Sequence, residues 1–426
     1  MGNFEFSILL LKNIYLYIII LFLVFILYIP IIKKFSNSII DPMFMCILSV
    51  ILADAIPFFL FFTGNCKSQY LFYFILVEIF YWLSLLLTYN KDATFAIKHI
   101  KNEDFLVKRL FYLSIILFFS INIYIYSFVG IPLFMDSRFE LFKNSLPGLG
   151  ILNRVSNFSS YFIIFYSFHR IISMKQNKYV FYIFSIIVVD FLSASRGSIL
   201  TICFVYFIYF FFFLKKKPKL KKKYIPVLLA FPILIGLFYK GSSANGGGLI
   251  NGTVSLLFRF VAYGDIYWYA YPNQMIDYVS KDTTLLGFFS GILRPFRIIS
   301  DGQAGIPIGT SLLWNVAPYM KGTFAGPNGR LPICMWAYFG WFGILVSIIL
   351  GYISSFVLGN LKKHLGDSIL GIAIYGYLYL TILNIPSDPT VFIDCITTII
   401  ICYIIYFISI LKNSNFVITI KRKKRL

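Results

Sequence analysis

The stretch ILLLKNIYLYIIILFLVFILYIPII, which runs from Ile8 to Ile32, contains only one charged residue, Lys12. A helix needs about 20 apolar residues to cross the roughly 30 Å hydrocarbon core of a bilayer, and this stretch is long enough. It is too long and too bulky near its end for a cleaved signal peptide, and it lacks an A-x-A-like cleavage site. We therefore expect it to remain in the protein as a membrane-spanning helix.

Ten similar apolar runs follow, and together they decide the fold class. The chain is 59% hydrophobic and 13% charged, compared with roughly 25% charged in a soluble domain, and its mean hydropathy is +0.82. Only helices and closed barrels cross bilayers, and these runs lack the alternating polarity of barrel strands. The sequence thus predicts an all-α polytopic membrane protein with eleven transmembrane helices. The predicted spans are Ile8–Ile32, Met43–Phe62, Tyr70–Thr88, Leu110–Ile131, Phe158–Ile172, Tyr179–Ala194, Ile199–Leu214, Tyr224–Tyr239, Pro332–Leu358, Ser368–Ile385 and Thr390–Leu411.

The net charge of +21 does not indicate a nucleic-acid partner, because most basic residues lie in short tracts beside apolar runs. Such tracts anchor cytoplasmic loops. With the Lys33–Lys34 loop in the cytoplasm, the alternation of spans places 25 of the 38 Lys and Arg residues on that side. The amino terminus is then outside the cell, and the carboxyl terminus is in the cytoplasm. The tracts Lys215–Lys223 and Lys421–Arg425 fit topology anchors, with binding to anionic membrane lipid as the alternative.

One long segment interrupts the apolar runs, and we call it the large loop (Gly241–Leu331). It divides the chain into a first membrane bundle (1–240), an extracytoplasmic loop with amphipathic helices (241–331), and a second bundle with a basic cytoplasmic tail (332–426). Loops of this length are usually functional or disordered, and the arginines and aromatics of this one argue against disorder. We therefore expect the large loop to carry the active site.

Several kinds of chemistry are disfavoured on the outer face. The histidines His99, His169 and His364 all fall at predicted cytoplasmic edges, so no His-dependent triad or His-ligated metal site forms outside. The chain has no GxxxxGK[ST] phosphate loop and no Asp-x-Asp pair for a nucleotide-sugar metal. The six cysteines show no CxxC spacing and are interpreted as buried free thiols. The sequence therefore predicts no metal and no cofactor.

Arginine is the residue type that the outer face offers. Arg196 lies in SASRGS, between two predicted spans, where small neighbours permit close approach of a phosphate and the next helix start supplies free amides. The alternative is a snorkelling anchor. Arg294 and Arg297 flank Pro295 and would clamp a diphosphate. Arg259 would bind the same group or pair with Asp265. Further candidates are Arg330, Arg138 and Arg154.

Two sets of acidic residues are candidates for proton transfer. Asp265 and Asp301 in the large loop lie nearest to arginines and aromatics, so either would accept a proton from an attacking sugar hydroxyl. Asp277 and Asp282 are interpreted as solvated carboxylates.

Asp54, Glu78 and Asp190 fall inside predicted spans, where charges are costly and often functional. Asp54 and Glu78 are at similar predicted depth and would meet. The set fits either a proton relay or structural polar packing. The tyrosines and Trp268 between Tyr263 and Tyr271 would stack on sugars or, more simply, lie at the bilayer interface.

The SASRGS turn, the large loop, and the sequence GPNGRLPICMWAYFGWFG (Gly326–Gly343) that enters the next span resemble the Wzy-type O-antigen and capsule polysaccharide polymerases. The resemblance covers the many-span topology over most of the chain. Proteins of this family are described with Arg-x10-Gly elements in outer loops. The spacing from Arg294 to Gly305 fits such an element, and that from Arg138 to Gly150 misses it by one residue.

The resemblance implies that a glycan on a polyisoprenyl diphosphate is transferred to the end sugar of a new lipid-linked repeat unit. Arg196, Arg294, Arg297, Arg259 and Arg330 would hold the diphosphate, and Asp265 or Asp301 would position the acceptor. A chain-length regulator is a further expected partner. The alternatives are an O-antigen ligase-like transferase, which would carry an outer-loop histidine, and a lipid-linked oligosaccharide flippase, which would not need the large loop.

Overall fold

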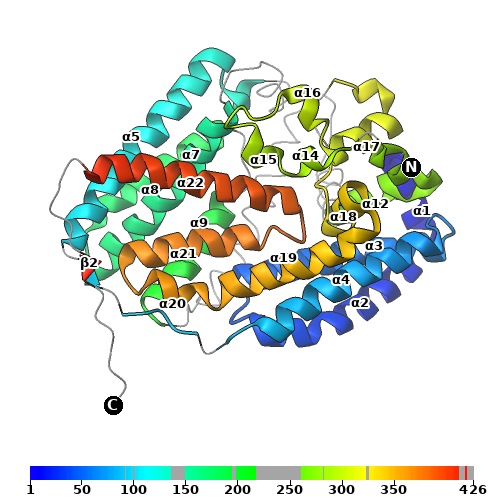
Figure 1. Ribbon diagram of the computed structural model, residues 1–426, viewed down its shortest axis with the longest axis horizontal. Coiled ribbons are helices and arrows are strands. Elements are labelled where there is room, and N and C mark those ends of the chain that lie inside the picture. The colour runs from blue at the N-terminus through cyan, green and yellow to red at the C-terminus, as the bar shows by residue number, and fades with distance from the viewer. Residues whose placement is uncertain are drawn as a thin grey trace. The chain divides into compact units, whose positions relative to one another are not determined.

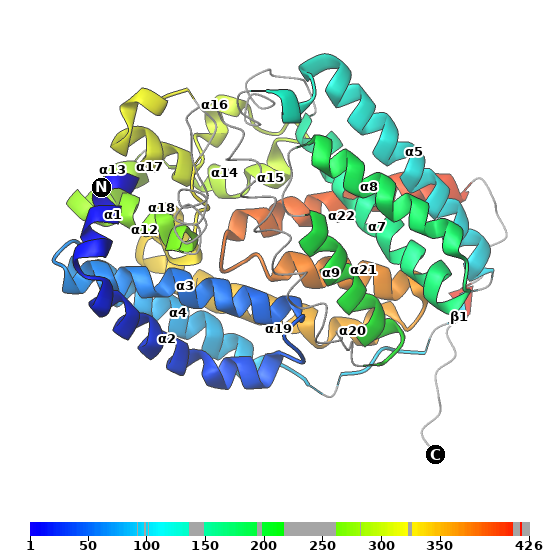
Figure 2. The ribbon, with the colours of Figure 1, turned by 180° about the vertical axis from the view of Figure 1, so that it is seen from behind.

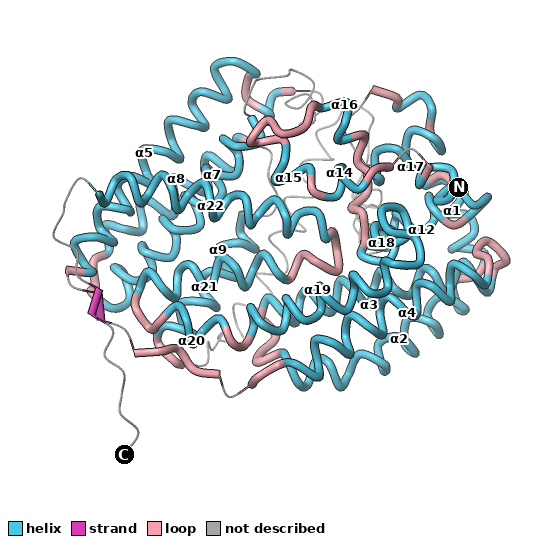
Figure 3. Tube along the Cα trace, viewed as in Figure 1, coloured by secondary structure: helices cyan, strands magenta, loops and turns pink. Residues whose placement is uncertain are grey.

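The computed structural model describes residues 1–91, 93–97, 99–100, 102–135, 149–193, 198–216, 261–281, 283–322, 326–411 and 418–419. This part of the chain is almost entirely helical, with one pair of two-residue strands, β1 (His99–Ile100) and β2 (Ile418–Thr419), that run antiparallel (Figure 3). By its internal packing the chain forms two units, Met1–Phe72 with Lys217–Met275, and Tyr73–Lys216 with Ile276–Leu426. We call them unit 1 and unit 2 and describe each by itself.

Helices lie at ten of the eleven predicted spans, and the other span, Tyr224–Tyr239, is outside the described residues. These helices are α2 (Ile14–Phe35), α3 (Pro42–Phe62), α4 (Ser68–Thr88), α5 (Glu103–Val129), α7 (Leu149–Phe168), α8 (Val180–Leu192), α9 (Ser198–Ile208), α18 (Leu331–Phe339) with α19 (Gly343–Leu358), α21 (Ile369–Ile382) and α22 (Pro389–Leu411). Within the described residues, 5 segments are long and apolar enough to cross a membrane: Ile14–Phe35, Pro42–Phe62, Ser68–Thr88, Glu103–Phe134 and Leu331–Leu358. The protein is therefore a helical membrane protein, and the full count of eleven spans stays a prediction.

Two predicted boundaries were wrong. The run Ile8–Ile32 breaks at Asn13 into α1 (Asn3–Lys12) and α2, and the Asn13 amide donates to the Leu9 carbonyl oxygen at 3.0 Å. Such a side-chain bond competes with continuation of the helix. The helix at the fifth predicted span begins at Leu149 rather than at Phe158, because its mixed-polarity first turns are covered by protein, with Val155 and Ser156 buried.

Unit 1 packs α2 beside α3 (Figure 2), and short helices from the large loop lie on α3. These helices are η6 (Ala262–Gly264) and α12 (Asp265–Ala270), and η7 (Pro272–Gln274) follows α12 and contacts it. Gly264 permits the close approach, because a Cβ there would lie 2.8 Å from the Ala53 carbonyl oxygen. The described start of the large loop is thus a packed element.

Helix α1 covers the aromatic side chains of α12. The Phe6 ring stacks on Trp268 with centroids 4.0 Å apart, and the Asn3 side-chain oxygen accepts from Trp268 Nε1 at 3.1 Å and from the Tyr269 hydroxyl at 2.7 Å. Tyr267, Trp268, Tyr269 and Tyr271 are buried. These four side chains are therefore neither stacking surfaces for sugars nor anchors at the bilayer interface, and the sequence interpretation was wrong for them. Tyr263 is 47% exposed, and its role stays a prediction.

We expect Phe6→Ala to lower the free energy of unfolding by about 3–5 kcal/mol, the usual range for a buried phenylalanine. The measurement is thermal unfolding of the purified protein in detergent. Phe4→Ala is the matched control, since Phe4 lies in the same helix but is 78% exposed. Equal unfolding temperatures for the two variants would contradict the packing of α1 on α12.

Unit 2 is built around α7, which contacts α5, α8, α9, α21 and α22 (Figure 2). The Tyr161 hydroxyl of α7 donates to the Ala373 carbonyl oxygen of α21 at 3.0 Å. It lies over Gly376, where a Cβ would collide with it. Figure 1 shows α19, α21 and α22 running side by side. The shorter turns of this unit are η1 (Pro132–Phe134), η2 (His169–Ser173), η3 (Asn177–Tyr179), η4 (Tyr209–Phe213) and η9 (Gly340–Phe342).

The second half of the large loop folds into short helices within unit 2. They are α13 (Met275–Ser280), α14 (Leu285–Phe288), α15 (Ser290–Leu293), α16 (Asp301–Ala304), α17 (Ile308–Val316) and η8 (Pro318–Met320). The Thr283 hydroxyl donates to the Ala337 carbonyl oxygen of α18 at 2.7 Å, and Trp336 Nε1 donates to Asp277 at 2.9 Å. Asp277 is thus a packing residue rather than a solvated carboxylate, and Asp282 lies outside the described residues.

The segments of unit 2 that were predicted to be cytoplasmic contact one another. The Ala96 amide donates to the Lys362 carbonyl oxygen of α20 (Leu361–Leu365) at 3.3 Å, and Asp367 N donates to the Ala96 oxygen at 2.9 Å. Arg170 pairs with Asp104 at 3.1 Å. These contacts lie at the ends of α19 and α7 that are opposite to Arg330 and Arg154. The 16 residues of α19 alone span about 24 Å.

Candidate functional site

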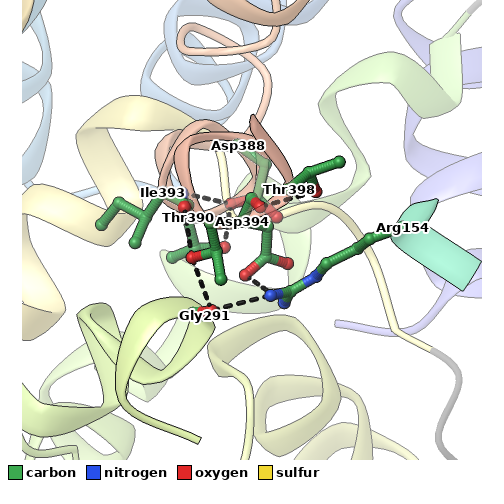
Figure 4. Close-up of polar contacts among 8 residues, drawn as sticks. Arg154, Gly291, Asp388, Thr390, Ile393, Asp394 and Thr398 are labelled. Atoms are coloured by element: carbon green, nitrogen blue, oxygen red, sulfur yellow. Dashed lines mark hydrogen bonds and ion pairs between the residues drawn. The ribbon is translucent and has the colours of Figure 1, made fainter. Parts of the chain in front are cut away.

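An ion pair between α7 and α22 forms the centre of the site. Arg154 Nη2 lies 2.6 Å from Asp394 Oδ1, with 39% of the aspartate side chain exposed. Arg154 is in the second turn of α7 and Asp394 is near the start of α22, and Figure 4 shows the two side chains pointing toward each other. A charge-assisted bond of this length holds both groups in one orientation.

Gly291 of α15 joins the large loop to this pair. Its carbonyl oxygen accepts from Arg154 Nη1 at 2.7 Å and from the Thr397 hydroxyl at 2.9 Å (Figure 4). A Cβ at position 291 would overlap Asp394 Oδ1. The sequence needs glycine here because the loop backbone lies directly against the carboxylate.

Asp388 determines where α22 begins. Its Oδ1 accepts from Thr390 N at 3.0 Å and from the Thr390 hydroxyl at 2.6 Å, and Pro389 is the first helical residue. This is an N-cap, which satisfies an amide that the helix itself leaves unpaired. Oδ2 of Asp388 faces Gly329 N at 3.5 Å. The cap therefore fixes where α22 starts and hence the position of Asp394, which lies six residues, or about 9 Å, further along the helix axis.

Arg330 is buried at the end of the large loop, with 3% of its surface exposed. Its Nη1 lies 3.5 Å from the Ser387 hydroxyl, and the next amide, Leu331 N, donates to the Pro386 carbonyl oxygen at 3.1 Å. These contacts bind the entry of α18 to the turn before α22. The buried cation of Arg330 thus lies beside Ser387, the residue that precedes Asp388.

Arg294 and Arg297 lie on an exposed turn after α15. The turn is closed by a bond from Arg297 N to the Arg294 carbonyl oxygen at 2.9 Å, and Arg297 has a φ of 55°. The chain therefore does not continue as a helix after Pro295. Arg294 is close enough to Asp394 for their charges to interact. Both arginines of the turn are exposed.

The charges of this arrangement do not balance. Arg154 and Arg294 lie within electrostatic range of Asp394, Arg330 lies at the turn that leads to Asp388, and Arg297 adds a further positive charge in the exposed turn after α15. Several arginines with excess positive charge suit an anion with several oxygens, such as a diphosphate. No metal cluster contributes within the described part of the chain, where three or more His, Cys, Asp or Glu side chains do not gather.

The other predicted site residues are placed as follows. Arg196 and Arg259 lie outside the described residues, and so does the side chain of Asp301, although α16 itself is described. Asp265 opens α12 in unit 1, whereas Arg294, Arg297 and Arg330 belong to unit 2. The structure thus places Arg294 within electrostatic range of Asp394 and Arg330 at the turn before α22, and the roles of Asp265 and Asp301 stay predictions.

Two of the three predicted intramembrane acids accept hydrogen bonds from neighbouring side chains, and the choice between a proton relay and structural polar packing stays a prediction. Asp54 is buried in unit 1 and accepts from the Tyr28 hydroxyl at 2.5 Å. Glu78 accepts from Trp82 Nε1 at 3.0 Å, one turn along α4 in unit 2. Asp190, near the end of α8, lies within electrostatic range of Tyr126. A meeting of Asp54 with Glu78 stays a prediction, because the two belong to different units.

Sequence reasoning missed Asp388 and Asp394. Asp394 falls inside the predicted span Thr390–Leu411, so the rule that selected the other intramembrane acids would also have selected it. Asp388 precedes Pro389, a common signature of a helix start. The pairing of Asp394 with Arg154 has no local signal, since 240 positions separate the two residues in the chain.

These features define the class of the protein: a helical membrane protein with an arginine–aspartate cluster at one end of its second unit. Comparison with known proteins adds no closer relationship, since no family model, no curated protein and no solved structure matches the chain.

Proposed function

We propose that this protein is a membrane glycosyltransferase that polymerises polyisoprenyl-diphosphate-linked oligosaccharide repeat units into a surface polysaccharide. The observation that carries the proposal is the ion pair of Arg154 with Asp394, with Arg294 within electrostatic range of Asp394, Arg330 at the turn before α22, and Arg294 and Arg297 exposed. In the reaction, an acceptor hydroxyl oxygen attacks the anomeric carbon of the donor glycan. The bond from that carbon to the phosphate oxygen breaks, and the electron pair leaves with the diphosphate. Fixed arginines stabilise this developing charge.

The arrangement of unit 2 supports this proposal in a second way. The start of α7, the large loop and the turn before α22 were all predicted to face outward, and these three segments supply the residues of the cluster. The predicted cytoplasmic segments contact each other elsewhere. This grouping favours a site on the outer face of the cytoplasmic membrane, where lipid-linked repeat units are joined. A chain-length regulator is the proposed protein partner.

Deletion of the gene in the producing cell tests the proposal. If the protein is a polymerase, the deletion should leave single repeat units at the surface in place of a ladder of glycan lengths. Accumulation of repeat units on the inner leaflet would identify a flippase instead. Long glycans that remain on the lipid carrier would identify a ligase. An unchanged ladder would contradict any role in building the glycan.

A further inference from the structure

The two aspartates of the cluster differ in what their oxygens do. Asp388 Oδ1 receives two hydrogen bonds from Thr390, and its Oδ2 faces Gly329 N. Asp394 Oδ1 forms the ion pair with Arg154, whereas Asp394 Oδ2 has no polar partner among the described residues. Asp394 is also 39% exposed at its side chain. One carboxylate is committed to capping a helix, and the other keeps an accessible oxygen.

Arg154 holds the open carboxylate in a fixed orientation. Its guanidinium bridges two acceptors, Asp394 Oδ1 at 2.6 Å and the Gly291 carbonyl oxygen at 2.7 Å. Because Thr397 also donates to Gly291, the loop backbone, α7 and α22 are tied at one point (Figure 4). A carboxylate oriented by a partner in this way can serve as a general base for an acceptor hydroxyl that binds within hydrogen-bond reach of its other oxygen.

We infer that Asp394 is the catalytic base of the glycosyl transfer, with Arg154 as its positioning residue. The inference rests on the proposed function. The acceptor hydroxyl donates its proton to Asp394 Oδ2 as its oxygen forms the new bond to the anomeric carbon. The diphosphate departs with the electron pair of the broken bond and is held by Arg294, whose charge interacts with Asp394. The proton then passes from Asp394 to water or to the released diphosphate, which restores the carboxylate.

The test compares variants expressed in cells that lack the gene and follows the ladder of glycan lengths at equal protein level. We expect Asp394→Asn to lower polymerisation about 100-fold or more, the usual contribution of a positioned base. Asp394→Glu should retain measurable activity. Asp104→Asn is the matched control and should stay within about twofold of wild type, because Asp104 also pairs with an arginine, Arg170 at 3.1 Å, but in segments predicted to be cytoplasmic.

Two further measurements separate a base from a merely structural ion pair. Binding of the purified Asp394→Asn variant to vesicles that contain polyisoprenyl diphosphate should stay near the wild-type value, since the proton acceptor is not the diphosphate ligand. The double variant Arg154→Gln with Asp394→Asn removes both charges, so restored polymerisation would show that only charge balance mattered and would overturn the inference.

The failures of the two proposals are distinguishable. If deletion of the gene leaves the glycan ladder intact, the proposed function fails. If deletion collapses the ladder but Asp394→Asn restores it fully, the proposed function stands and Asp394 is not the base.

Discussion

Replacing Gly291 by alanine should abolish glycan polymerisation and lower the unfolding temperature of the protein. The added Cβ would overlap Asp394 Oδ1, and the carbonyl of the same residue holds Arg154 and Thr397. Either α15 moves off α22 or the ion pair breaks, and overpacking of this kind costs about 1–3 kcal/mol. Both results disorient the carboxylate on which the reaction depends.

The matched control for this substitution is Gly302→Ala. Gly302 lies in α16 of the same loop, and a Cβ there would have nothing within 4 Å. The readouts are the glycan ladder and thermal unfolding in detergent. If Gly291→Ala and Gly302→Ala gave the same glycan ladder and the same unfolding temperature, the close packing of the loop against Asp394 would not be needed for activity or stability.

Arg294→Ala should lower polymerisation about 100-fold without a loss of folded protein, because removing one stabilising donor from developing charge costs about that much. The side chain is exposed, so little packing is lost. Arg294→Lys should recover only part of the activity, since an ammonium cannot form the two parallel bonds that a guanidinium makes to phosphate.

Lys281→Ala removes one positive charge from an exposed position of the same loop and is the control for a general charge effect. The measurement is the glycan ladder with protein levels checked in the membrane fraction. A normal ladder from Arg294→Ala at normal protein level, or an equal loss from Lys281→Ala, would argue against a specific role of Arg294 in holding the diphosphate.

The helices of this protein could be predicted because long apolar runs have one stable conformation in a bilayer. The errors occurred where polarity is mixed. The side chain of Asn13 hydrogen-bonds to the backbone where α1 ends. The polar first turns of α7 predicted a loop, but they are helical because α5 and neighbouring helices cover them. Hydropathy reports the average environment of a segment, so a few polar residues are enough to move a boundary.

The arginines of the site were predictable by residue type, because they lie in segments that the charge bias assigned to one side of the membrane. Their partners were not. Asp394 meets Arg154 only after α7 and α22 pack together, and Gly291 matters only because a carboxylate lies against it. The aromatics of α12 invited a sugar-binding interpretation, but α1 buries them through contacts that join opposite parts of the chain.

Photo-crosslinking is the most direct test of the central claim, which is that the arginine cluster of unit 2 holds a lipid diphosphate. The probe is a polyisoprenyl diphosphate with a photoreactive group beside the phosphates, added to the purified protein in lipid nanodiscs, followed by mapping of the labelled peptides. The account predicts labels on the peptides that carry Arg294 and Asp394, and their loss when unlabelled polyisoprenyl diphosphate is added in excess. Labels confined to other parts of the chain, such as the segments around Arg170 and Lys362, would contradict it.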